Sequence, residues 1–319
     1  MTFSSNEQGR RLQTDMNKLM GLVRRNLLVY FKDKSAIFFS MLTPIIVLSL
    51  YILYLKGNYV SSISQAAERL MDFINVQDID AFANGFLLSG ILGSAMFTVP
   101  YNTLSTIVKD RESGVDNDVR ATPVKRSQIV LAYFIASSSS AFVMTSLVMT
   151  AGLILLNALS PMYISVGSII YLYVTVLLGS LSATAFFMPI MMLIKSQSVS
   201  GAFMGIISAV SGFVIGAYLP VSQFSQGVQT LCNLFPATSV TVMLRHFCLN
   251  GLLDHMNECI GGVDGGVFAD TLREYFSFSV RIAGHDIANV HAGMYVVAVT
   301  IVFIGLLIPI YVRTASKND

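Results

Sequence analysis

The chain has 319 residues, of which 54% are hydrophobic and 12% are charged, and its formal net charge at pH 7 is +2. Soluble domains carry roughly a quarter charged residues, so this composition, with a mean hydropathy of +0.67, excludes a water-soluble globular protein and predicts an integral membrane protein. The net charge says little about partners, because the distribution of charge matters more than its sum in a membrane protein.

The first 35 residues form a polar and basic lead. Residues 17–34 place Leu, Val and Phe among Lys and Arg at roughly helical spacing. A basic helix with one apolar face tends to lie in the headgroup plane, so we predict an in-plane helix here; an ordinary cytoplasmic lead is the alternative. The first apolar run begins only near Ala36, so no cleavable signal peptide is visible and we expect a cytoplasmic N-terminus.

Six apolar runs are long enough to cross a bilayer, because twenty residues of helix span roughly 30 Å, the thickness of the hydrocarbon core. They lie at residues 36–55, 86–107, 129–156, 169–194, 201–219 and 294–312. The sequence therefore predicts an all-α, polytopic membrane domain over residues 36–312. Between the first two runs we expect an external loop that contains a short amphipathic helix around residues 66–74.

A dense island of charge separates the second and third runs, at residues 109–126 with the sequence KDRESGVDNDVRATPVKR. Its residue types predict a short polar helix that is entered through Gly114 and stopped by Pro123. Lys125 and Arg126 precede the next apolar run, where cations anchor a helix end on the cytoplasmic side.

The distribution of Lys and Arg predicts the orientation of the chain. Fifteen of them fall on the side that holds both ends of the chain and the charged island, and five fall on the other side. The positive-inside rule therefore places both termini, including the tail at residues 313–319, in the cytoplasm. The five external cations would be Lys56, Arg69, Arg245, Arg273 and Arg281.

The fifth run carries small residues at a spacing of four, which allow helices to approach each other closely. These residues are Gly201, Gly205, Gly212 and Gly216. The pattern predicts a helix-packing surface, and the sequence leaves open whether the same chain or a second copy covers it.

Residues 221–289 form a long external region between the fifth and sixth runs. It contains a break at Pro236, with Arg245 nine residues later, and a polar insert from about residue 252. Cys232, Cys248 and Cys259 all lie here, and no pairing among three thiols follows from the sequence. The His, Cys and acidic residues of the region fit no compact ligand spacing, so we expect solvated loop residues and no metal.

Catalytic motifs are missing from the sequence. It contains no Gly-rich loop that ends in Lys and Ser or Thr, so an ATP-driven protein of this kind needs another polypeptide to hydrolyse ATP. The apolar runs hold almost no ionisable residues, which argues against an ion-coupled carrier. We expect no catalytic residue in this chain, no cofactor bound to it and no nucleic-acid partner.

The island sequence DRESG followed by DVRATPVKR resembles the loop after the second membrane helix in type-2 ABC exporter permeases. The break at Pro236 followed by Arg245 is similar to the external region of the same family. The resemblance implies short re-entrant helices before the last span and an N-terminal helix that helps to cradle a cytoplasmic ATPase. It also implies that the island forms a coupling helix whose ATPase-facing residues are Asp110, Arg111, Glu112, Gly114, Asp118 and Pro123.

The same resemblance implies the assembly and the function. The chain would pair with ABC ATPase subunits, which hold ATP and Mg, and with a second permease copy, identical or related, in a bacterial plasma membrane. It would export an amphiphilic drug, peptide or lipid-like substrate by alternating access. The alternative is a membrane protein without a motor, such as a bacteriocin-immunity or scaffolding protein, which leaves the charged island without a role. An intramembrane enzyme is a third hypothesis.

Overall fold

The computed structural model describes residues 2–70, 72–261 and 263–316. Its first half contains α1 (Thr2–Lys32), α2 (Lys34–Leu50), a π-helical turn (Tyr51–Leu55), α3 (Lys56–Ala66), a 3-10 turn (Glu68–Leu70), α4 (Val76–Glu112), α5 (Val115–Ala121) and α6 (Arg126–Leu159). The second half contains α7 (Val166–Leu193), α8 (Gln197–Val214), α9 (Gln226–Asn233), α10 (Pro236–Ile260), α11 (Val267–Tyr275), β1 (Val280–Ile282), β2 (His285–Ile287) and α12 (Asn289–Ser316).

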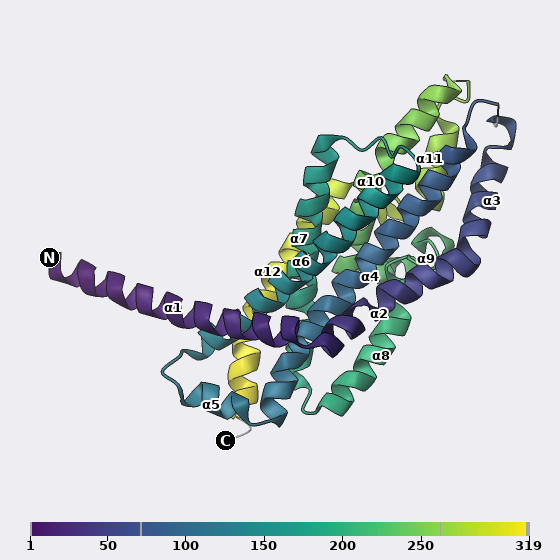
Figure 1. Cartoon of the computed structure of the whole chain (residues 1–319). Coiled ribbons are helices and arrows are strands. Elements are labelled where there is room, and N and C mark those ends of the chain that lie inside the picture. Colours follow the sequence, from purple (N-terminus) through teal and green to yellow (C-terminus); the bar gives the residue numbers. More distant parts are fainter. Residues whose placement is uncertain (1, 71, 262, 317–319) are drawn as a thin grey trace.

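Six helices of the described chain are long and apolar enough to cross a membrane, which confirms the predicted all-helical fold with six spans. They are α2 continued into α3, then α4, α6, α7, α8 and α12. Figure 1 shows them as a bundle, with α1 projecting sideways from it. The bundle has an α5 end, where α12 also finishes, and an α11 end, where α3 and α11 lie.

Helix α4 lies at the centre of the bundle, in contact with α2, α6, α7, α8 and α10. Glycines on α4 permit this crowding: a Cβ at Gly90 would lie 2.9 Å from the Cβ of Ala217, and one at Gly93 would collide with Thr241. Pro100 interrupts the hydrogen-bond ladder of α4 without ending the helix, and its carbonyl accepts a hydrogen bond from Ser137 Oγ at 3.2 Å.

The external loop between the first two spans differs from its prediction. The first helix continues through the π-helical turn to Ala66, and α4 begins already at Val76, so the expected short helix around residues 66–74 is replaced by a 3-10 turn. The cause is packing: Tyr59 and Ile63 of α3 are buried, and the Tyr59 ring meets Phe86 edge to face, whereas Phe73 is 48% exposed.

One further boundary and one element differ from the prediction. Helix α8 ends at Val214, five residues before the expected end, because the chain turns at Gly216 with a φ of +70°. The insert includes a two-stranded antiparallel hairpin, β1 and β2, in an otherwise helical chain. Its turn residues Ala283 and Gly284 both have positive φ, as a two-residue hairpin loop requires.

Candidate coupling site

The last turn of α4 contains Asp110, whose side chain points into the protein. Asp110 is 3% exposed. The guanidinium of Arg25 on α1 binds both carboxylate oxygens, with Nη2 at 2.6 Å from Oδ1, and Tyr133 on α6 donates to Oδ2 at 2.5 Å. A buried carboxylate is stable only when donors replace its water, and the bidentate guanidinium and the phenol supply them. Asp110 therefore joins α4 to α1 and α6.

Arg111, the next residue, reaches the end of a different helix. Its Nη1 donates to the backbone oxygens of Met192 at 2.9 Å and Ile194 at 3.0 Å, at the carboxyl end of α7. The last carbonyls of a helix lack intrahelical donors and carry partial negative charge, so a cation there satisfies both needs. Arg111 therefore attaches α4 to α7.

Glu112 completes the series at the start of α8. Its Oε2 accepts a hydrogen bond from the backbone N–H of Gln197 at 3.0 Å, and the Gln197 side chain donates to the carbonyl of Ser105 on α4 at 3.0 Å. A carboxylate at a helix amino terminus fits the positive end of the helix dipole and one of its free N–H groups. Three consecutive residues of α4 thus bind four different helices.

The predicted short helix of the island is α5, and it begins where expected. Gly114 has a φ of +81°, a conformation that side-chain-bearing residues rarely adopt, and it lets the chain reverse directly after α4. Asp116 and Arg120 pair along α5 at 2.5 Å. Pro123 follows the end of the helix at Ala121. Glu112, Asp118 and Pro123 are exposed on this side of the protein.

Helix α1 contacts the carboxyl-terminal part of the charged island, between α5 and α6. Lys18 donates to the carbonyl of Pro123 at 2.9 Å, and Lys125 pairs with Asp15 at 2.7 Å. The hydrogen bond from the Lys125 ammonium lowers the pKa of the Asp15 carboxyl. These contacts are exposed, so their contribution to stability is small, and they serve to orient α1 against the turn into α6.

The six predicted coupling residues differ in exposure, and two of them, Arg111 and Gly114, are half-buried. Glu112, Asp118 and Pro123 are accessible from outside, whereas Asp110 is buried, which differs from the expectation that it faces a partner. The sequence reasoning missed Arg25 and Tyr133, the partners of Asp110. Tyr133 stands in an apolar run and Arg25 among several cations, so neither carried a signal of its own.

Arg245, counted above among the external cations, is fully buried. It lies on α10, which starts with Pro236 at its first turn and packs against α4, α7 and α12. Its guanidinium donates to the backbone oxygens of Phe276, of Ser277 at 3.0 Å and of Gly216 at 3.2 Å. Its Cζ lies 4.3 Å from the centre of the Phe86 ring. Arg245 therefore connects the α8–α9 loop and the segment after α11 to the bundle.

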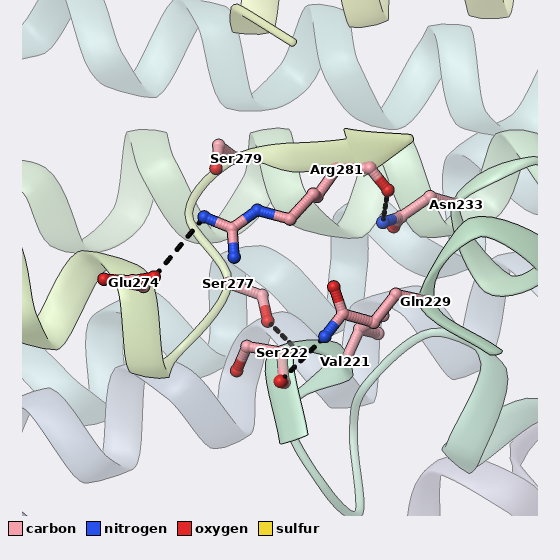
Figure 2. A pocket seen from close by; sticks show the side chains of 8 residues that line it. All are labelled: Val221, Ser222, Gln229, Asn233, Glu274, Ser277, Ser279 and Arg281. Atoms are coloured by element: carbon pink, nitrogen blue, oxygen red, sulfur yellow. Dashed lines mark hydrogen bonds and ion pairs between the residues drawn. The ribbon is translucent and has the colours of Figure 1, made fainter. Parts of the chain in front are cut away.

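A small pocket next to this region is drawn in Figure 2. Asn233 on α9 donates to the carbonyl of Arg281 at 2.8 Å, and Gln229 donates to the carbonyl of Ser222 at 2.9 Å. The pocket has a cavity volume of about 20 Å³, which is room for about one water molecule. The pocket is therefore a joint between segments of the insert and is too small for a cargo molecule.

The glycines of the fifth span behave differently from one another. A Cβ at Gly201 or Gly205 would meet no atom within 4 Å, whereas one at Gly212 would collide with the Tyr218 ring. Gly216 serves the turn after α8. Within the described chain Gly212 therefore makes room for the loop that follows α8 and not for another helix, and the face with Gly201 and Gly205 is uncovered.

The three cysteines are free thiols. Cys232 and Cys248 are buried, and Cys259 is exposed with its Sγ 3.6 Å from His255 Nε2. In the residues that the structure describes, no group of three or more His, Cys, Asp or Glu side chains is arranged to hold a metal ion.

The chain was also compared with known proteins. A comparison with curated proteins gave no match. The family model described as ABC-2 family transporter protein matches residues 60–316, about four-fifths of the chain, and so includes α4, the island, α10 and α12. The chain therefore belongs to the ABC-2 family of transporter proteins, as a multi-pass membrane permease and not a catalytic subunit.

Proposed function

We propose that this permease is the membrane part of an ATP-driven exporter in a bacterial plasma membrane. Both termini and the α5 end face the cytoplasm, where separate ABC ATPase subunits carry ATP and Mg. The exposed residues Glu112, Asp118 and Pro123 contact an ATPase subunit, and a second permease copy, identical or related, completes the pathway. The cargo is an amphiphilic drug, peptide or lipid-like molecule.

One observation carries this proposal: the last turn of α4 binds four helices, and it leads directly into α5. Asp110 connects α1 and α6, Arg111 connects α7, and Glu112 connects α8. A short helix at this junction is placed so that a small displacement changes the positions of several spans together. A membrane protein without a motor has no use for such a junction.

The mechanism follows from that connection. Closure of two ATPase subunits displaces α5, and the contacts of Asp110, Arg111 and Glu112 carry the displacement into α1, α6, α7 and α8. Such a device needs two arrangements of the spans, and nucleotide binding shifts the population from one to the other. The scarcity of ionisable residues within the apolar runs supports this cargo class, since a path lined by Phe, Met and Tyr suits amphiphiles.

Two substitutions test the contact with the ATPase. Asp118→Arg reverses an exposed charge on α5, and Asp72→Arg makes the same change at an exposed site near the other end of the bundle. In a detergent pull-down followed by mass spectrometry and an ATPase assay, we expect Asp118→Arg to lose the co-eluting ATPase at least tenfold and Asp72→Arg to retain it. Equal recovery with both variants contradicts the contact, and no ATP-binding partner with the native chain contradicts the exporter.

A second pair of variants tests transmission. Glu112→Ala removes the acceptor of the Gln197 N–H, whereas Glu112→Gln keeps an oxygen there without the charge. We expect Glu112→Ala to insert normally but to lose most export and most of the stimulation of the ATPase, and Glu112→Gln to retain part of both. ATP-dependent uptake of a fluorescent amphiphile into inverted vesicles, in which the cytoplasmic face points outward, measures the loss, and native rates in Glu112→Ala contradict the proposal.

A further inference from the structure

A groove with a cavity volume of about 460 Å³ runs along the outside of the bundle between α2, α4 and α6. Each helix contributes a stripe of side chains at spacings of three and four residues: positions 41–48 on α2, 84–91 on α4 and 148–156 on α6. Among the described residues that line it, Asn84 alone has a polar side chain. The volume is that of a small-molecule site, about 300–1,000 Å³.

The groove exists because α6 carries small residues where it faces α4. Leu88 of α4 forms its floor at 5% exposure, and it fits there because α6 has Gly152 opposite, where a Cβ would collide with it. Ala151 leaves the space beside it open, while Ile45 and Leu155 project at the rim with 47% and 60% exposure. The groove therefore opens sideways from three membrane-spanning helices, toward lipid.

The position along α4 sets the depth of the groove in the membrane. Lys109 is the first residue of the charged island, which we expect at the cytoplasmic surface of the membrane. Asn84 lies 25 positions from it, which is roughly 38 Å of helix at about 1.5 Å per residue. This exceeds the hydrocarbon core of about 30 Å but not the full bilayer of about 40–45 Å. One turn beyond Asn84, Asp80 pairs with Lys56 at 3.4 Å. The groove therefore begins at headgroup level and runs into the hydrocarbon.

The polar end of the groove lacks a partner. No described residue forms a hydrogen bond with the Asn84 carboxamide, which is half-buried and therefore accessible to a molecule that lies in the groove. The neighbouring Lys56–Asp80 pair offers one positive and one negative charge, partly exposed. An occupant that fits has a zwitterionic head, a hydrogen-bond acceptor below it and an apolar tail.

We propose that this groove holds one acyl chain of a zwitterionic bilayer phospholipid. Asn84 donates to an ester carbonyl oxygen, the phosphate and ammonium of the headgroup face Lys56 and Asp80, and the chain lies over Leu88 beside Ala151. The site goes beyond the proposed export function, because it depends on the membrane itself and not on which cargo is moved.

Photolabelling of the full chain tests this site. The chain is reconstituted in phosphatidylethanolamine vesicles that contain a small fraction of phosphatidylethanolamine with a diazirine near the ester end of one acyl chain. After illumination, mass spectrometry locates the labelled residues. We expect the three stripes to be labelled at least fivefold more than exposed apolar residues elsewhere, such as Tyr171 on α7 and Ile206 on α8, which are 57% and 62% exposed.

Matched variants decide the outcome. Ala151→Phe fills the groove and should reduce its labelling at least threefold, while Leu147→Phe, at a 61% exposed position of α6 outside the lining, should leave it unchanged. Asn84→Leu should also reduce it, and Asn84→Gln less so. Even labelling around the bundle, or undiminished labelling in Ala151→Phe, overturns the proposal. A disulfide-linked dimer of an Ile45→Cys variant lacking the native cysteines assigns the groove to a second copy and overturns it too.

Discussion

The two ends of the bundle each bury a charged side chain, and they stabilise it in opposite ways. Near the α5 end, Asp110 is bound by side chains from two other helices, Arg25 and Tyr133. Near the α11 end, Arg245 has no carboxylate partner within hydrogen-bond distance among the described residues and binds three backbone carbonyls instead. The first contact is made between side chains that can separate and pair again, whereas the second is made to fixed points of the backbone.

This difference indicates which end can move. Side-chain pairs such as Arg25 and Asp110 tolerate a change in distance between helices, because both side chains have several rotamers. Backbone carbonyls move only with their whole segment, so Arg245 makes the α8–α9 loop, the end of α11 and α10 one unit. We therefore expect the α5 end to rearrange during transport and the Arg245 contacts to persist throughout.

The largest effect is expected from Arg245→Met, which leaves three backbone oxygens without their donor. Unsatisfied buried acceptors cost about 1–3 kcal/mol each, partly offset because the buried charge also disappears, so we expect a loss of about 2–4 kcal/mol in the free energy of unfolding. Buried Cys248, three residues away, reports the change, since a thiol-reactive dye should reach it at a lower temperature.

Arg245→Lys is the control, because an ammonium can replace one or two of the three hydrogen bonds, and its loss should be intermediate. If the Arg245→Met variant unfolds at the same temperature as the native protein, the proposed contrast between a rigid and a mobile end of the bundle is wrong.

A smaller effect is expected at the α5 end from Asp110→Asn, which keeps an oxygen for Tyr133 but removes the charge that faces Arg25. The Arg25 side chain is 32% exposed, so solvent screens the loss, and we expect about 1–2 kcal/mol. Export should fall by more than this stability change explains, because the contact also transmits movement.

A double-mutant cycle with Arg25→Gln separates the pair from other effects. We expect the stability losses of Asp110→Asn and Arg25→Gln to be less than additive in the double variant. Full additivity, measured by chemical denaturation in detergent, would show that the two side chains do not act as a pair.

The smallest effect concerns acid sensitivity of the insert. Hydrogen bonds from Arg281 lower the pKa of Asp286, and backbone N–H groups of Phe268 and Gly266 lower that of Asp264. A carboxyl with a lowered folded-state pKa stabilises the fold above its unfolded value of 3.8, and this stability is lost as the pH falls below that value. Asp286 is exposed and Asp264 is half-buried at the protein surface, so solvent screens both and each contributes well under about 1 kcal/mol.

Limited proteolysis between pH 3 and pH 6 should therefore cut the insert faster only below about pH 4. Asp286→Asn should reduce this difference between acid and neutral pH. Cleavage that accelerates first at the α5 end on acidification would reverse the expected order of the two ends.

The sequence predicted those parts of the fold that depend on local pattern. The apolar runs predicted six membrane helices, and the positions of Gly114 and Pro123 predicted the short helix α5 that lies between these two residues. The hydropathy pattern did not predict the outer part of α4. Asp78 and Asp80 are typical of a loop, but α4 includes both. A helix stabilised there by tertiary packing carries no apolar run of its own.

The candidate site was predicted only in part, because its contacts join distant residues. Arg25 and Asp110 are 85 positions apart, and nothing in either neighbourhood specifies the other. The sequence around Arg245 does indicate burial, since the neighbouring residues are largely apolar: Val240, Val242, Leu244, Cys248 and Leu249. A single cation in such a stretch is typical of a buried, hydrogen-bonded group.

One feature of α4 connects the two ends mechanically. Phe86, under Arg245, and Asp110 belong to the same uninterrupted helix (Figure 1), 24 positions or roughly 36 Å apart. Axial torque applied at Asp110 must turn Phe86 as well, unless the helix itself yields. Pro100 lies between them and removes one backbone donor, which makes it the place where a helix bends or twists with least resistance. A bend or twist at Pro100 therefore lets the half of α4 that carries Asp110 change its orientation while the half that carries Phe86 stays fixed by the Arg245 contacts.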